Sequence, residues 1–277
     1  MTVLSGRGVW SFELRYFEPP EAGGAAVELE SLGYTAAWLP DVGGDLFTAM
    51  DNVLDATSTM TIASGILNVW YHTTAEVGEW CNRLPDDQRH RVLLGIGISH
   101  GPLIGERWRR PLAVMGEYLD GLDAIGIPTE QRCVAALGPK MLGLARDRSS
   151  GAHPYLVTPE HTEFARSILG DAGLFVEQGV VFETDADKAR QIARDALDGY
   201  VGLPNYVNNW KRFGFTYDDI ATKSDRFVDA LVAWGDADAI NERIDSHHKA
   251  GADHVCIQVL NERGAPMNHA AWRALAP

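Results

Sequence analysis

The stretch Cys133-Val-Ala-Ala-Leu-Gly-Pro-Lys-Met-Leu142 predicts a short buried strand that ends at a Gly-Pro turn and continues at once as a helix. Gly138 allows the backbone to approach a ligand closely, and Pro139 suits the first helical position because it lacks an N–H group. Lys140 places a positive charge in the first turn, where the helix dipole favours a negative one. A bound phosphate would remove this conflict, since free N–H groups at a helix N-terminus bind anions. The alternative is a plain strand-to-helix turn with a solvated lysine.

Short apolar segments alternate with helical patterns along the whole chain. Most of these segments are continuously apolar, which is typical of parallel strands buried on both faces. The expected strands are residues 8–12, 36–40, 60–67, 92–98, 133–137, 152–157, 174–182 and 254–260. Gly33, Gly151 and Gly251 precede three of them and are predicted to end helices. Eight such units predict an α/β fold, a (β/α)8 TIM barrel, in a single domain of residues 1–277.

The spacing of the expected strands is irregular before the last one. Roughly 70 residues separate the seventh strand from the eighth, far more than a simple connection needs. The sequence therefore predicts an extra helical insertion before the last strand. This insertion includes residues 200–215 and forms either a lid or an oligomer contact.

Composition limits the class of partner. The 277 residues can bury a full core, and the net charge of −14 argues against nucleic acid or an anionic membrane as the main partner. The three cysteines are far apart and match neither a disulfide framework nor a metal-ligand spacing, which favours a reducing cytoplasm. No apolar run approaches the ~20 residues that span a bilayer. A small-molecule substrate is the expected partner.

Active sites in such barrels lie at the carboxyl ends of the strands, so the residues at these ends are the candidates. Asp41 is the one obvious carboxylate, whereas a glycosidase needs two, and Asp41 with His100 gives too few ligands for a metal. The glycines instead suit a flat, aromatic, phosphorylated cofactor lying across the barrel mouth. The end residues are Trp10, Ser11, Asp41, Gly65, Ile66, Leu67, Asn68, Ser99, His100, Leu137, Gly138 and Tyr155.

For two of the polar residues in this set, His100 and Asp41, the sequence leaves two roles open. His100 follows a glycine-rich strand and is either an acid/base catalyst, since its pKa lies near neutrality, or a loop histidine bonded to backbone. Asp41 either accepts a hydrogen bond from a ligand ring or caps the helix that begins near Asp45. His153 and His254 are expected at strand starts, which is the wrong end of the barrel for catalysis.

Taken together, the segments resemble the bacterial luciferase-like superfamily, in particular its coenzyme F420 (deazaflavin)-dependent oxidoreductases of the actinobacterial type. The resemblance covers nearly the whole chain and is weakest over residues 200–234. The matching segments are Leu32-Gly-Tyr-Thr-Ala-Ala-Trp-Leu-Pro-Asp41, Ile62-Ala-Ser-Gly-Ile-Leu-Asn68, Arg91-Val-Leu-Leu-Gly-Ile-Gly-Ile-Ser-His100, Ala135-Ala-Leu-Gly-Pro-Lys-Met141 and Gly251-Ala-Asp-His-Val255.

The resemblance implies roles for particular residues. It places the cofactor's phosphate tail at the turn after the fifth strand and its ring at the end of the third strand, with a non-proline cis peptide at Gly65–Ile66 or Ser64–Gly65. His100 falls where relatives carry an acid/base residue. The implied cofactor-binding residues are Asp41, Gly65, Ile66, Asn68, Ile98, Ser99, Leu137, Gly138, Lys140 and Met141.

The resemblance implies a cytoplasmic, dimeric oxidoreductase that transfers a hydride to or from coenzyme F420, with His100 as the proton donor to the substrate. Alcohol and sugar-phosphate dehydrogenases of this group carry a histidine after the acidic residue of the second strand, where this chain has Val42. A sugar-phosphate substrate is therefore not expected. One alternative is an FMN-dependent monooxygenase on the same scaffold, and another is a non-catalytic cofactor-binding member.

Overall fold

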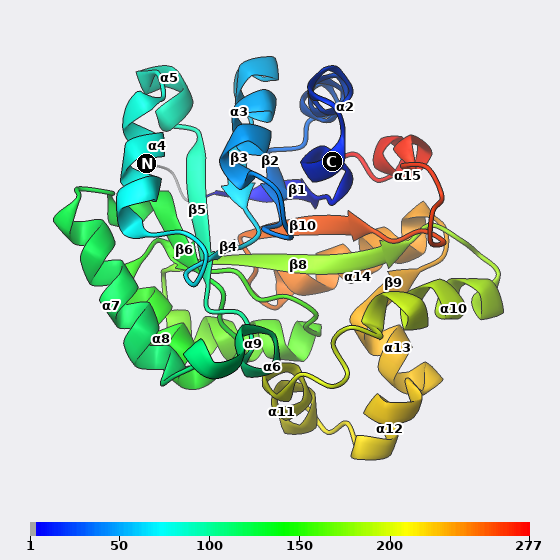
Figure 1. Ribbon diagram of the computed structural model, residues 1–277. Coiled ribbons are helices and arrows are strands. Elements are labelled where there is room, and N and C mark those ends of the chain that lie inside the picture. Colours follow the sequence, from blue (N-terminus) through cyan, green and yellow to red (C-terminus); the bar gives the residue numbers. More distant parts are fainter. Residues whose placement is uncertain (1–3) are drawn as a thin grey trace.

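Eight parallel strands close into a barrel because the first strand pairs with the last. The computed structural model describes residues 4–277, and Figure 1 shows helices surrounding the strands. β1 and β10 pair in register from Gly6 with His254 to Val9 with Ile257. The barrel strands are β1 (Gly6–Trp10), β2 (Ala36–Leu39), β3 (Thr61–Ser64) with its continuation β4 (Leu67–Asn68), β5 (Val92–Gly97), β6 (Arg132–Val134), β7 (Gly151–Ala152), β8 (Gly173–Val181) and β10 (His254–Val259).

The predicted TIM barrel is confirmed, and all eight expected strands are present. Two of them end three or more residues earlier than predicted. β6 stops at Val134 and β7 at Ala152, and the residues that follow run along the barrel mouth. After β7, His153 N–H still donates to Val134 C=O and Pro154 C=O accepts from Glu177 N–H, but Pro154 has no N–H with which to extend the ladder.

The third barrel strand is interrupted between β3 and β4. The peptide bond Gly65–Ile66 is cis, as the resemblance predicted. β4 then pairs with β5, Leu67 opposite Ile96. A Cβ at Gly65 would lie 2.5 Å from Nε1 of Trp10, the last residue of β1. The segment between β3 and β4 can therefore approach Trp10 closely only because residue 65 is glycine.

Helices follow the barrel strands and cover their outer face (Figure 1). Gly33 and Gly251 have positive φ after helices, as predicted, whereas Gly151 opens β7 and Ser149 follows the preceding helix instead. These helices are α1 (Glu13–Tyr16), α2 (Pro19–Ser31), α3 (Leu46–Ala56), α4 (Thr74–Arg83), α5 (Asp86–Arg89), α6 (Gly101–Ile104), α7 (Pro111–Ala124), α8 (Pro139–Arg148), α9 (Pro159–Leu169), α14 (Ala237–Lys249) and α15 (His269–Ala274).

The predicted insertion before the last strand is confirmed, and it contains one strand that was not predicted. β9 (Val232–Trp234) pairs with the carboxyl end of β8. Trp210 anchors the insertion, because its Nε1–H donates to Leu156 C=O at 3.0 Å and its ring packs on Phe227. The insertion helices are α10 (Ala186–Leu197), α11 (Pro204–Arg212), α12 (Tyr217–Thr222) and α13 (Asp225–Leu231).

The barrel interior is filled by aromatic and small side chains. Trp38 on β2 stacks on His153 at 4.2 Å between ring centroids and contacts Phe175 of β8, so its ring crosses the interior. Its Nε1–H donates to His254 Nε2 at 3.2 Å, which satisfies a buried histidine near the start of β10.

Within residues 4–277, none of the helices combines the length and the apolarity that a bilayer crossing requires.

Candidate active site

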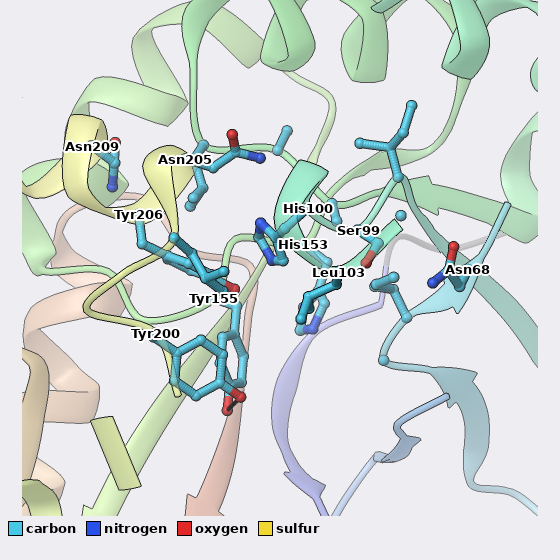
Figure 2. Close-up of a pocket in the computed structure, with 18 of the residues that line it drawn as sticks. Asn68, Ser99, His100, Leu103, His153, Tyr155, Tyr200, Asn205, Tyr206 and Asn209 are labelled. Carbon is cyan, nitrogen blue, oxygen red and sulfur yellow. Dashed lines mark hydrogen bonds between the residues drawn. The ribbon is translucent and has the colours of Figure 1, made fainter. Parts of the chain in front are cut away.

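A cavity of about 650 Å³ opens at the carboxyl ends of the barrel strands. Figure 2 shows residues from the strand ends on one side of it and residues from the insertion on the other. The volume suits a cofactor-sized ligand. The predicted site residues that line the cavity are Asp41, Gly65, Ile66, Asn68, Ile98, Ser99, His100, Leu137, Gly138 and Met141.

Lys140 is the predicted site residue that does not line this cavity. It is exposed at the second position of α8 and forms no ion pair with any residue that the structure describes. Its backbone lies beside the cavity, whereas its ammonium group is in solvent.

The N-terminus of α8 has the features of an anion site. Gly138 is the N-cap, no side chain caps the helix, and the first internal bond runs from Leu142 N–H to Gly138 C=O. The N–H groups of Lys140 and Met141 are therefore without helical partners. A Cβ at Gly138 would meet no atom within 4 Å, so there is open space beside these donors.

A second positive group at the cavity was not predicted. Arg212, at the end of α11, lines the cavity. Its Nη1 donates to Asn209 Oδ1 at 3.0 Å, and its guanidinium lies over Phe164 of α9, 5.6 Å from the ring centroid. The sequence predicted a lid or an oligomer contact for the insertion with residues 200–215 but singled out none of its side chains as site residues. The four-residue spacing of Tyr206 and Trp210 was the available signal, because it marks one buried helix face.

Asp41 is held at the end of β2 by two donors. Its Oδ2 accepts hydrogen bonds from Asn68 N–H and from His72 Nε2, both at 3.0 Å. The hydrogen bond to Asp41 raises the pKa of His72, despite the burial that opposes it. Asp45 caps α3 with its own side chain, so the alternative of Asp41 as a helix cap is wrong. His72 was not singled out in the sequence.

His100 projects over the mouth because the chain turns sharply at the end of β5. Ser99 has a φ of 60°, in the left-handed region, and His100 is the N-cap of α6. The Nδ1 of His100 is buried without a partner, and its Nε2 bonds to no described residue and is not buried. Burial lowers the pKa of His100, so the ring is neutral at neutral pH.

A continuous aromatic wall joins β1 to His100. Neighbouring ring centroids along it are 4.8 to 5.5 Å apart. Two members, Tyr200 and Tyr206, come from the insertion and were not predicted as site residues. The aromatic wall consists, in spatial order, of Phe12, Trp10, Tyr155, Tyr200, Tyr206 and His100.

The expectation for His153 is wrong, since this residue lines the cavity. β7 is only two residues long, so His153 follows its carboxyl end instead of opening a longer strand. Its Nδ1 bonds to Phe175 C=O at 2.7 Å, and burial lowers its pKa to about 4.

Within the described residues there is no group of three or more His, Cys, Asp or Glu side chains that could hold a metal ion.

A closed parallel barrel with a glycine- and aromatic-lined cavity at its carboxyl mouth belongs to the class of (β/α)8 proteins with mouth-located active sites. Residues 5–126 match the model of the family described as luciferase-like monooxygenase. The predicted resemblance to the luciferase-like superfamily is thereby confirmed over this part of the chain. A comparison with curated proteins finds no significant match.

Solved structures with the same fold include enzymes of both cofactor types. An F420-dependent secondary alcohol dehydrogenase in complex with an F420-acetone adduct aligns at 14% identity and a TM-score of 0.74, over 98% of this chain and 97% of that one. The coenzyme F420-dependent tetrahydromethanopterin reductase of Methanopyrus kandleri aligns at 15% identity and a TM-score of 0.70, over 98% of this chain and 97% of that one.

An FMN enzyme aligns almost as well. The oxygenating constituent of 3,6-diketocamphane monooxygenase from the CAM plasmid of Pseudomonas putida, in complex with FMN, shares 14% identity at a TM-score of 0.67, over 99% of this chain and 96% of that one. At such identities these alignments establish the fold alone.

Proposed function

We propose that this chain is a coenzyme F420-dependent oxidoreductase that transfers a hydride between the deazaflavin and a small organic substrate. The observation that carries the proposal is that one cavity has an uncapped helix N-terminus at one end and a histidine with a free Nε2 at the other. Gly138 lies at the first end and His100 at the second. F420-dependent enzymes with the same fold support this choice of cofactor.

The residues present fit a flat, phosphorylated cofactor. The free N–H groups of Lys140 and Met141 would hold a phosphate, with Arg212 as a nearby positive charge. Gly65, Ile66 and the Asp41–Asn68 pair would border the ring. When bound, the deazaflavin would supply or accept the hydride. His100 would then exchange a proton with the substrate through Nε2.

The open mouth favours hydride transfer over oxygenation. Leu103 and Val42 line the cavity and are 64% and 44% exposed. A monooxygenase on this scaffold would need a chamber closed to water to protect a reactive peroxide. FMN-dependent oxygenation therefore remains the second candidate, supported by the FMN complex with the same fold.

Gly138→Leu tests the location of the cofactor. The variant should bind the deazaflavin at least about 100-fold more weakly, close to 2.7 kcal/mol, because its side chain fills the space beside the free N–H groups. The fold should tolerate it, since no atom lies within 4 Å of the new Cβ. Quenching of deazaflavin fluorescence on titration with protein gives the dissociation constant.

The matched control is Gly143→Leu on the same helix. Gly143 also has open space around its Cβ but does not line the cavity. Its replacement should leave cofactor affinity within about twofold and stabilise α8 by up to ~1 kcal/mol. Equal affinity in Gly138→Leu and Gly143→Leu would place the phosphate elsewhere.

A further inference from the structure

Tyr206 has a hydroxyl group without a protein partner. The residue is 7% exposed and lines the cavity, yet its Oη is not fully buried and forms no hydrogen bond to any residue in the range 4–277. Apart from those of His100, the other polar groups of the aromatic wall are already engaged. Tyr155 Oη donates to Gln258 Oε1 at 2.7 Å and lies 3.3 Å from Tyr200 Oη, and Trp10 Nε1 donates to Gly65 C=O at 3.0 Å.

The Tyr206 ring is fixed from two sides. It stacks on Trp210 at 5.5 Å with an interplanar angle of 26°, and the edge of Tyr200 meets it at 5.3 Å and 85°. Trp210 is itself tied to the barrel through Leu156 C=O. Burial raises the pKa of Tyr206 well above its ordinary value, so the phenol keeps its proton and remains a donor. The Tyr206 hydroxyl is therefore a hydrogen-bond donor whose position is fixed before a ligand binds.

Tyr206 and His100 lie next to each other in the aromatic wall (Figure 2). Their ring centroids are 5.2 Å apart, and each carries a polar atom that no protein group satisfies, Tyr206 Oη and His100 Nε2. Both residues line the same cavity. Two unsatisfied groups this close on one wall can bind a single ligand oxygen.

The surroundings restrict the rest of the ligand. Apart from His100, which is neutral at neutral pH, the aromatic wall has no titratable groups other than tyrosines. The charged side chains that line the cavity, Asp41 and Arg212, belong to the part assigned above to the cofactor. Aromatic faces favour flat apolar ligands, and an unpaired ligand charge would be costly to bury here.

We propose that Tyr206 is a second catalytic residue, which joins His100 in binding the carbonyl oxygen of an uncharged, flat, apolar substrate such as a quinone, an enone or an aryl ketone. This inference rests on the proposed function for the hydride that the reaction needs. In a ketone, the carbonyl carbon would accept the hydride that a bound reduced deazaflavin supplies, which oxidises the deazaflavin, and the C=O π bond would break. Its electron pair would move to the oxygen, Tyr206 Oη–H would stabilise that charge, and the protonated form of His100 would deliver the proton, which solvent replaces.

A binding experiment on the protein without cofactor tests the oxygen site separately from the proposed function. The probe is 4-nitrophenolate at pH 8, whose oxygen resembles the charged oxygen of the reaction, with nitrobenzene as a probe that lacks this oxygen. Tyr206→Phe should weaken 4-nitrophenolate binding by about 10- to 100-fold, because one hydrogen bond to a charged oxygen is lost. Nitrobenzene affinity should change less than about twofold.

Two results would overturn the inference: equal binding of 4-nitrophenolate by native protein and Tyr206→Phe, or no saturable binding of this probe to the native protein. With deazaflavin and a quinone, Tyr206→Phe should also lower kcat by at least about tenfold at unchanged cofactor affinity. Tyr217→Phe is the matched control, because Tyr217 is 65% exposed on α12, and it should behave as native. If native protein binds 4-nitrophenolate through Tyr206 but no deazaflavin, the proposed function fails and the oxygen site stands.

Discussion

Replacement of His100 by alanine or glutamine should lower turnover by ~10² to 10⁴-fold while cofactor affinity stays within a few-fold. His100 is the cavity residue with an unpartnered imidazole Nε2 at the end of a barrel strand. Hydride addition leaves negative charge on the substrate, and a positioned proton donor removes it. Steady-state rates with deazaflavin and a quinone or enone, alongside fluorescence titration of the cofactor, separate turnover from binding.

The matched control is His90→Gln, since His90 is exposed after α5 and does not line the cavity. It should turn over like the native protein. In the reducing direction the native rate should fall as pH rises through the pKa of His100, which burial lowers from 6.5. This decline should vanish in His100→Gln. Near-native turnover by His100→Ala would transfer the proton-donor role to solvent or Asp41.

Mild acid should unfold the protein, with a midpoint between about pH 4 and 5.5. Burial lowers the pKa from 6.5 to about 4 in His153 and His161 and to about 3 in His247 and His254. As the pH falls below 6.5 the unfolded chain binds protons that the folded chain does not. Each histidine then costs ~1.4 kcal/mol of stability per pH unit, against a typical total of 5–15 kcal/mol. Circular dichroism followed from pH 7 to pH 3 gives the midpoint.

The ionisation of Glu177 changes the pH dependence of folding stability in the direction opposite to that of the buried histidines, so this residue provides an internal control. Burial raises its pKa from 4.5 to about 8, so the folded state binds a proton between these values that the unfolded state does not. Its contribution is full below pH 4.5 and is lost as the pH rises through 8. Glu177→Gln should therefore abolish the loss of stability between pH 6.5 and 8 and leave the acid transition in place. A native fold that persists to pH 3 would contradict the buried neutral histidines.

The barrel was predictable because its strands are buried on both faces and therefore appear as continuous apolar segments in the sequence. The ends of β6 and β7 were less predictable, since apolar residues continue beyond the last ladder pair. At β7 the signal was present in Pro154, which cannot extend a ladder. β9 escaped prediction because its three residues follow α13 without a turn.

The candidate site was predictable where it depends on barrel geometry and unpredictable where it depends on tertiary contacts. Strand-end residues such as Asn68 and Ser99 meet at the mouth of any such barrel. Tyr206 and Arg212 reach the cavity because Trp210 docks on Leu156, and nothing local in the sequence specifies that contact. Their roles, the role of Lys140, the dimeric state and the cytoplasmic location remain predictions.

Titration of the purified protein, without added cofactor, by coenzyme F420 and by FMN tests the central claim most directly. Fluorescence of each compound reports binding, and Gly138→Leu serves as the site-specific reference. We expect saturable F420 binding in the micromolar range or tighter, at least about tenfold stronger than FMN binding and lost in Gly138→Leu. Stronger binding of FMN would support the monooxygenase, and binding of neither compound would contradict a cofactor-dependent oxidoreductase altogether.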